Sequence, residues 1–148
     1  MSTVVARWLA AGDAGDVDAF DHLVHADAVI HAPAGLSTTG ASEEKAVCLE
    51  GLAAITDLHH ALQEVVVEGD VEMARVVVTG TITTDFGGVP GTGRVFRMDQ
   101  AVVTHLRAGK VAEGARSQTS RRCARRSPSS PCCRAPASDE SRPTSSQR

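Results

Sequence analysis

The sequence predicts an α+β fold in which three N-terminal helices pack against one face of a cone-shaped, curved antiparallel sheet. Helical apolar periodicity is confined to the first 55 residues. From Asp57 to Glu113 the chain instead has β-rich runs, separated by two short turns and one long Gly/Pro loop. Helices followed by an antiparallel meander are an α+β pattern. Packing helices on a curved sheet leaves an apolar pocket between the two layers.

Charge and composition divide the chain near residue 118. The 148 residues predict one folded domain, and 42% hydrophobic content with only 3% aromatic residues predicts a core of Val, Ala, Leu and Ile. Residues 119–148 contain seven Arg against Asp139 and Glu140, a net charge of +5 that leaves −8 for residues 1–118. An acidic body does not favour nucleic-acid binding.

The remaining composition argues against a metal site and a membrane location. The four cysteines form no C-x-x-C pair, so we expect neither a zinc site nor a disulfide framework. No apolar run is long enough to span a membrane. The N-terminus lacks the basic start and long apolar core of a signal peptide. We therefore expect a cytoplasmic protein.

Three helices are expected before residue 56. The first covers residues 3–12, where Val4, Val5, Trp8 and Leu9 form one apolar stripe. Asp16 is a good N-cap for a second helix. Four apolar residues would form its buried face, namely Val17, Phe20, Leu23 and Val24. The third helix covers about residues 43–55.

Five extended segments are expected, the first being Asp27–Pro33, in which Pro33 makes Ala32 extended. The other four form the meander: Leu58–Glu68, Val71–Asp85, Gly93–Leu106 and Val111–Gln118. A Gly-containing hairpin turn joins the last two strands. The loop Phe86–Thr92 is long enough to cover a cavity mouth and lacks the features of a phosphate-binding loop.

Residues 119–148 form a separate segment, so we divide the chain into a domain, 1–118, and a tail, 119–148. The tail has no Val, Leu, Ile, Met or aromatic residue. It cannot bury enough apolar surface to offset its ordering entropy, which predicts disorder. Its Arg/Ser/Pro/Cys content also resembles GC-rich DNA translated in a shifted frame. A genuine regulatory or binding tail is the alternative, and sequencing the gene would separate the two.

Three stretches together resemble a known family. They are GDVDAFDHLVHADAVIHAP, the hairpin DLHHALQEVVVEGDVEMARVVVTGTITTDFGGVPGTGRVF, and the final pair HLRAGKVAEG. In order and spacing they are similar to the SnoaL-like polyketide cyclases (ester cyclases) of the nuclear-transport-factor-2-like superfamily, over about residues 4–114. The resemblance implies an α+β cone, a homodimer formed through the outer sheet face, and cofactor-free aldol ring closure of a small apolar oxygenated molecule.

The resemblance also locates candidate residues. A His and an Asp that face each other on the last two strands of the family fall on Val102 and Arg116 here. The last hairpin should pair residue n with about 217 − n, where n is the residue number. If Val102 faces the cavity, alternation turns Gln100 inward and Asp99 outward, and a bulge would reverse this. Asp99 is therefore a second-rank catalytic candidate.

Two histidines match positions that line or rim the family's pocket, so the catalytic candidates are His31 and His59, followed by Asp99. A lone histidine such as His31 is more often a satisfied core or rim residue, which is the alternative for it. The expected substrate-binding residues are Gln100, Val102, Phe86, Phe96 and Trp8. Phenylalanines such as Phe86 and Phe96 are more often plain core residues, which is the alternative for both.

These features predict a cofactor-free cyclase- or isomerase-type enzyme acting on a polyketide-like apolar oxygenated substrate. His31 would be the base-like group, and His59 and Gln100 would orient oxygens. Two alternatives remain: a non-catalytic ligand-binding or dimerisation protein of the same fold, and a catalytically decayed member of the family. The orientation of His31 and His59 relative to the cavity separates the enzyme from these alternatives.

Overall fold

The computed structural model describes residues 2–119. The predicted tail lies outside this range except for Thr119. The helical elements are α1 (Val4–Ala14), η1 (Val17–Ala19), α2 (Phe20–Leu23), η2 (Pro33–Gly35) and α3 (Gly40–Ala54). The strands are β1 (Val24–His31), β2 (Ser37–Thr39), β3 (Ile55–Glu68), β4 (Val71–Ile82), β5 (Arg94–Arg107) and β6 (Lys110–Thr119).

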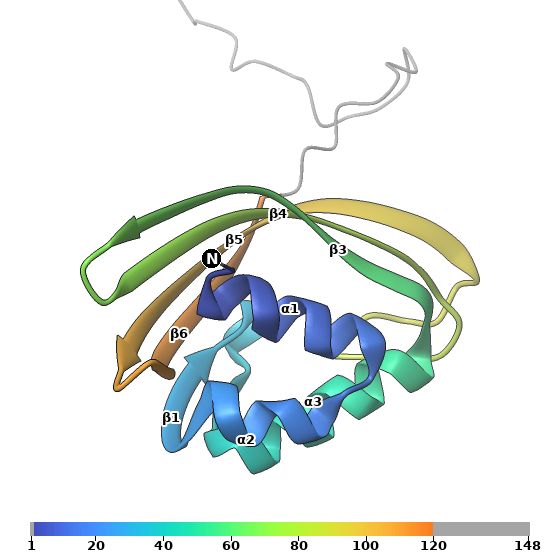
Figure 1. The fold of residues 1–148 in the computed structure, drawn as a ribbon. Coiled ribbons are helices and arrows are strands. Elements are labelled where there is room, and N and C mark those ends of the chain that lie inside the picture. The colour runs from blue at the N-terminus through green and yellow to red at the C-terminus, as the bar shows by residue number, and fades with distance from the viewer. Residues whose placement is uncertain (1, 120–148) are drawn as a thin grey trace, which may run out of the picture.

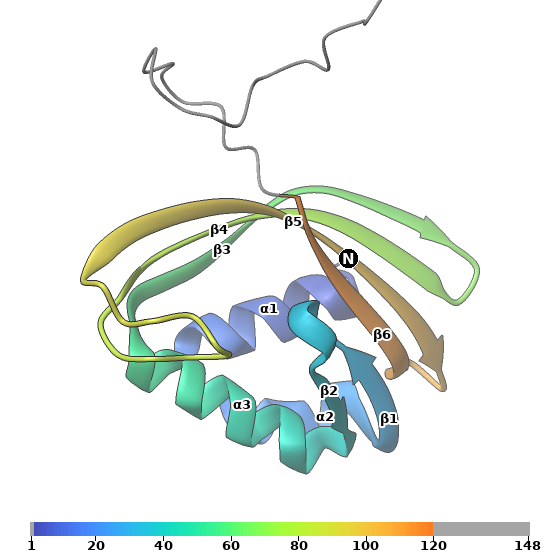
Figure 2. The ribbon, with the colours of Figure 1, turned by 180° about the vertical axis from the view of Figure 1, so that it is seen from behind.

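The helices lie under the concave face of one curved sheet, which confirms the predicted fold class (Figures 1 and 2). The strand order is β2-β1-β6-β5-β4-β3. The four long strands form the predicted antiparallel meander. However, β1 pairs with β6 in parallel, so the sheet is mixed rather than antiparallel throughout. Helix α3 carries the chain from β2 at one edge of this sheet to β3 at the other.

Helix α1 is fixed at both of its ends. The Thr3 side chain caps its N-terminus, and Gly15 ends it in the left-handed conformation, with φ of 71°. The helix therefore runs to Ala14 rather than ending at Gly12 as predicted. This extra half-turn puts Asp13 on the helix, where its side chain reaches β3. Its apolar stripe is buried as predicted: Val4, Val5, Trp8 and Leu9.

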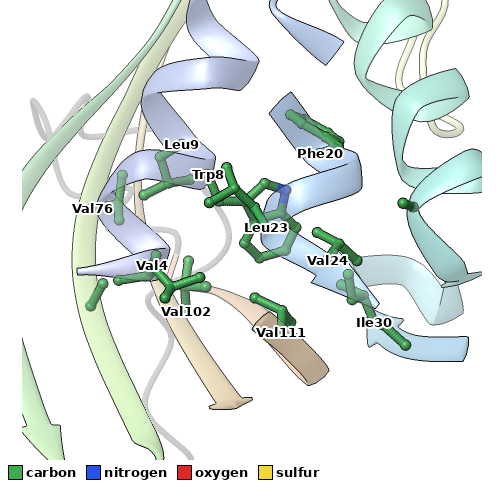
Figure 3. Packing of buried hydrophobic residues seen from close by; sticks show 14 of the residues in the cluster. Val4, Trp8, Leu9, Phe20, Leu23, Val24, Ile30, Val76, Val102 and Val111 are labelled. Atoms are coloured by element: carbon green, nitrogen blue, oxygen red, sulfur yellow. The ribbon is translucent and has the colours of Figure 1, made fainter. Parts of the chain in front are cut away.

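The predicted second helix is mostly replaced by other structure. Asp16 caps only a short 3₁₀ turn, η1, and α2 has four residues. The chain is already extended at Val24, because β1 begins there and pairs with β6. Phe20, Leu23 and Val24 are nevertheless buried, as predicted, in the core between helices and sheet (Figure 3). Val17, the fourth residue of the predicted buried face, is only partly buried, because it lies in η1. Sequence periodicity thus identified three of the four buried residues but not their backbone conformation.

A β-bulge between His105 and Leu106 sets the register of the last hairpin. Next to the turn, Leu106 faces Val111, as the predicted pairing requires. Beyond the bulge the register shifts by one residue, so Val102 faces Arg116. In the turn, Ala108 and Gly109 both have positive φ, which fits a tight hairpin.

Within residues 2–119, no helix has the length and apolar character needed to cross a bilayer.

Candidate active site and ligand cavity

A cavity of about 250 Å³ lies between the helices and the concave face of the sheet. Its wall is mostly apolar and includes Ile55, Leu58, Val78, Phe86, Phe96 and Met98. The β4–β5 loop folds back toward α3 (Figure 2) and contributes Phe86, Gly87 and Val89 to the lining. Few polar side chains interrupt this wall, and they form two groups on different strands of the sheet, around His60 of β3 and around Arg116 of β6.

The first polar group contains Glu44 of α3 and Arg116 of β6. The Glu44 side chain is 5% exposed and is 3.1 Å, Oε2 to Nη2, from the Arg116 guanidinium. Its other oxygen, Oε1, accepts a 2.5 Å hydrogen bond from the Thr38 hydroxyl. The guanidinium also lies over the Trp8 ring, 4.4 Å from the ring centroid. Arg116 is thus held between a carboxylate and an aromatic face.

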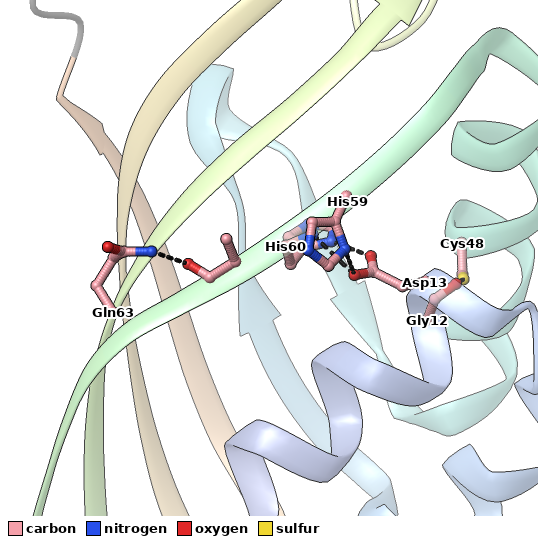
Figure 4. A network of polar contacts seen from close by, with 7 residues as sticks. Gly12, Asp13, Cys48, His59, His60 and Gln63 are labelled. Carbon is pink, nitrogen blue, oxygen red and sulfur yellow. Dashed lines mark hydrogen bonds and ion pairs between the residues drawn. The ribbon is translucent and has the colours of Figure 1, made fainter.

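The second polar group links Asp13 of α1 to two histidines of β3 (Figure 4). The Asp13 Oδ1 atom lies 2.5 Å from Nδ1 of His60, and Oδ2 lies 2.9 Å from Nδ1 of His59. The backbone N–H of His60 also donates to Oδ2, at 2.8 Å. Of the two histidines, His60 lines the cavity, whereas the His59 side chain is 65% exposed.

These contacts, together with burial, shift the pKa values of two groups near the cavity, Asp13 and Cys48. Burial by itself raises the pKa of Asp13, but the hydrogen bonds from the His60 side chain and backbone and the charges of His60 and His59 outweigh it. The net effect holds the pKa of Asp13 below its usual range, so this carboxylate is ionised near neutral pH. Burial raises the pKa of the Cys48 thiol, which also lines the cavity. Cys48 is therefore a poor source of nucleophilic thiolate.

Two buried polar atoms of the lining have no hydrogen-bond partner among residues 2–119. They are Oε1 of Gln100 on β5 and Nε of Arg116 on β6. Both residues line the cavity. Buried polar groups in native proteins are nearly always paired, so each such atom requires an explanation.

The predicted catalytic residues do not come together at this cavity. His31 is exposed and outside the lining, because Ala28 and Ile30 turn the other face of β1 into the core. His59 is held by Asp13 but is largely exposed. Asp99 also lies outside the lining and pairs with Arg75, at 3.1 Å between Nη2 and Oδ1. This geometry gives no support to a base at His31.

The predicted substrate-binding residues divide into two groups. Gln100, Phe86 and Phe96 line the cavity. Val102 points inward as expected, but it is fully buried in the core beside α1 and does not reach the cavity (Figure 3). Trp8 is likewise a core residue. Its ring packs against the Arg116 guanidinium but does not line the cavity.

Sequence reasoning missed Asp13, Glu44 and His60. A register shift between Thr56 and His59 in β3 decides which histidine faces the cavity, and alternation does not predict a bulge. Glu44 sits near the start of a helix, where an acidic residue is ordinarily explained by the helix dipole. Asp13 lies just beyond residue 12, where the first helix was predicted to end. Within residues 2–119, no group of three or more His, Cys, Asp or Glu is arranged to hold a metal ion.

A curved sheet that encloses an apolar cavity with its helices, with a few polar groups in that cavity, is the architecture of the α+β cone class, and such a cavity is the usual place for a ligand site. The chain belongs to the SnoaL-like polyketide cyclase family, whose model matches residues 2–117. This is a family of cyclase- and isomerase-type proteins that bind small apolar ligands.

Similar solved structures support this assignment. The chain is 28% identical to wild-type IdmH, a candidate polyketide cyclase from Streptomyces antibioticus, with a TM-score of 0.66 over 78% of this chain and 88% of that one. It is 25% identical to TsrD from Streptomyces laurentii, with a TM-score of 0.69 over 78% and 84% of the two chains. A SnoaL-like candidate polyketide cyclase from Jannaschia sp. CCS1, 21% identical, shares the fold with a TM-score of 0.70 over 78% and 82%. The comparison with curated proteins found no match.

Proposed function

We propose that this protein is a cofactor-free enzyme of the cyclase or isomerase type, in which His60 removes a proton next to a carbonyl group of a small apolar oxygenated molecule. The observation that carries this proposal is the 2.5 Å contact between Asp13 and Nδ1 of a histidine that lines the cavity. An oriented imidazole beside an apolar cavity is suited to general-base chemistry.

The contact with Asp13 sets the tautomer of His60. An ionised Asp13 is only an acceptor, so Nδ1 of a neutral His60 carries the proton and Nε2 carries the free lone pair. When Nε2 takes the proton of a C–H group next to a carbonyl, the electron pair of that bond moves to the carbonyl oxygen and an enolate forms. The neighbouring Asp13 carboxylate stabilises the imidazolium that results.

The enolate has two possible outcomes. Its carbon can attack a second carbonyl of the same molecule, which forms a C–C bond and closes a ring, and the new alkoxide then takes the proton from the imidazolium. Alternatively, the imidazolium returns the proton to another carbon, which is an isomerisation. Both outcomes conserve protons and electrons and require no co-reactant. The apolar wall favours them because it excludes water from the charged intermediate.

Other cavity groups are less suited to act as the base. Both oxygens of Glu44 already accept hydrogen bonds, from Thr38 and Arg116, so neither oxygen is free to accept a proton from a substrate. Arg116 is a permanent cation and therefore serves as a donor to a substrate oxygen. Cys48 is kept as the thiol by burial.

Hydrogen–deuterium exchange tests the proposal without knowledge of the natural substrate. The probe is 2-tetralone, a neutral bicyclic ketone with acidic protons, incubated with the protein in D₂O and followed by NMR. The wild-type protein should accelerate exchange next to the carbonyl, and His60→Gln should lower the rate by roughly 10²-fold or more. His59→Gln is the matched control, because this neighbour also contacts Asp13 but does not line the cavity, and it should retain most of the rate.

The same experiment separates the enzyme from a non-catalytic binding protein. The single tryptophan, Trp8, lies against the cavity residue Arg116, so its fluorescence should report binding of 2-tetralone. Binding without accelerated exchange would contradict the enzyme and support the binding protein. Equal losses in the two histidine variants would show that His60 has no special role.

A further inference from the structure

The two unpartnered polar atoms of the cavity lie on one face of neighbouring strands. Val102 faces Arg116 and Gln100 faces Gln118 in the register of β5 and β6, so Gln100 and Arg116 are diagonal neighbours. Residues in this relation point to the same side of a sheet, within reach of long side chains. His60 is two strands away from Gln100, on β3, so this pair belongs to a different part of the cavity.

The chemistry of the two atoms is complementary. Nε of Arg116 carries an N–H that can only donate, and Oε1 of Gln100 can only accept. Gln100 is 7% exposed, and neither atom has a partner among residues 2–119. Since an unpaired buried polar group destabilises the free protein, a ligand that pairs both atoms gains affinity from them.

The charge around this pair is already balanced. The guanidinium of Arg116 is neutralised by the buried carboxylate of Glu44, which the Thr38 hydroxyl also holds in place. An anionic ligand group that approached Arg116 would meet the Glu44 charge at short range in an apolar surrounding, where repulsion is poorly screened. A neutral oxygen can accept from Nε without disturbing the Glu44–Arg116 contact.

We infer that Gln100 and Arg116 form a recognition pair for a neutral ligand that carries both a carbonyl and a hydroxyl group, and that Glu44 makes this pair reject carboxylates. The carbonyl oxygen accepts from Nε of Arg116, and the hydroxyl donates to Oε1 of Gln100. This inference rests on the proposed function, because it specifies the substrate class of the same cavity. The recognition pair determines which ligands bind, whereas the proposed role of His60 is proton transfer.

Isothermal titration calorimetry on the full chain tests the inference. The probes are tetralones with a hydroxyl, methoxy or carboxylate group at each free aromatic position. At one position or more, the hydroxytetralone should bind roughly tenfold more tightly than its methyl ether, as expected for one hydrogen bond to a buried acceptor. The corresponding carboxylate should bind more weakly than both. Equal affinities for hydroxyl and methoxy probes at every position would overturn the inference.

Three variants assign these preferences to residues. In Gln100→Leu the preference for hydroxyl over methoxy should disappear, while in Gln63→Leu, the same change at an exposed glutamine of β3, it should persist. Arg116→Lys keeps the charge next to Glu44 but removes Nε, and it should abolish the advantage of a hydroxytetralone over the tetrahydronaphthol that lacks the ketone. Glu44→Gln should raise the affinity for the carboxylate probe by roughly tenfold, because it removes a like charge in an apolar surrounding. A preference that survives Gln100→Leu, or an unchanged carboxylate affinity in Glu44→Gln, would refute the assignment.

The calorimetry and the deuterium-exchange experiment test the two proposals separately. If hydroxytetralones bind selectively but no deuterium exchange is accelerated, the recognition pair stands and the enzyme proposal fails. If exchange depends on His60 but the probes bind without selectivity, the enzyme proposal stands and the recognition pair is refuted.

Discussion

His59 and His60 are consecutive residues of β3, yet one carboxylate holds both of them. Asp13 accepts from three donors, namely the Nδ1 groups of the two rings and the backbone N–H of His60. This concentration of donors lowers the pKa of Asp13 in spite of its burial. The position of the proposed base therefore depends on a residue 47 positions away in the sequence, at the C-terminal end of α1.

Asp13→Asn should change how stability depends on pH. The pKa of Asp13 is below 3.8 in the folded protein, so its ionised form stabilises the fold fully above the unfolded value. That contribution is lost as the pH falls through the lower folded value. Urea unfolding should show the wild-type advantage over Asp13→Asn above about pH 5, shrinking as the pH is lowered below 3.8. A difference that stays constant down to about pH 2 would mean that the Asp13 charge is not responsible.

At the scale of elements, α1 is fastened to the sheet through its first turn. The Glu72 carboxylate, buried on β4, accepts hydrogen bonds from the backbone N–H groups of Val4, at 3.0 Å, and Val5, at 2.7 Å. These N–H groups have no partner within the helix, and a negative charge at a helix N-terminus is favourable. Since Asp13 and Trp8 lie on this helix, the same contact also positions both polar groups of the cavity.

Glu72→Ala is therefore expected to be strongly destabilising. It leaves two buried N–H groups unpaired and removes the favourable charge, so the free energy of unfolding should fall by about 2–3 kcal/mol. Chemical denaturation followed by circular dichroism measures the change. Glu68→Ala, an exposed glutamate at the end of β3, is the control and should change it by less than about 0.5 kcal/mol. Similar losses in the two variants would contradict the role of Glu72 as a cap.

At the scale of the whole molecule, the outer face of the sheet has an exposed apolar strip. Val66 of β3 and Met73 of β4 face each other in the register and are 62% and 51% exposed. Val103 of β5, which is half-buried, lies opposite Met73 on the next strand. A contiguous apolar strip across three strands is a candidate protein–protein contact. The sequence resemblance independently predicts a homodimer through this face.

We therefore predict that the protein is a dimer that depends on this strip. Sedimentation velocity should give the mass of a dimer at micromolar concentration, and the double variant Val66→Glu, Met73→Glu should sediment as a monomer, because charge repulsion would replace apolar burial. The control pair, Asp18→Lys and Glu50→Lys, places charge changes on exposed helix positions and should leave the dimer intact. A wild-type monomer would refute the prediction.

Much of this architecture follows from local patterns. The stripe of Val4 and Trp8 predicts α1, alternation in β4 and β5 predicts which residues point inward, and the Ala108–Gly109 turn predicts the last hairpin. These features depend on neighbours along the chain, which a sequence displays directly. Alternation along the strand from Val102 likewise predicted that Gln100 points inward. In the structure Gln100 lines the cavity. The pattern failed where a long-range contact set the conformation, as at Val24, which enters β1 because it pairs with β6.

By itself, the sequence determined that the chain forms a helix-covered antiparallel meander and that Arg116, rather than an acid, lies near Val102 on the last strand. Only the tertiary structure decided which polar groups meet. Two bulges, one in β3 and one in β6 opposite the end of β5, set which face His60 and Arg116 present, and the extra residues of α1 bring Asp13 to His60. A bulge shifts the strand by one residue, so every side chain beyond it points to the opposite face of the sheet. Contacts between residues far apart in the sequence depend on how helices and strands pack. Periodicity along the sequence predicts neither the bulges nor these contacts.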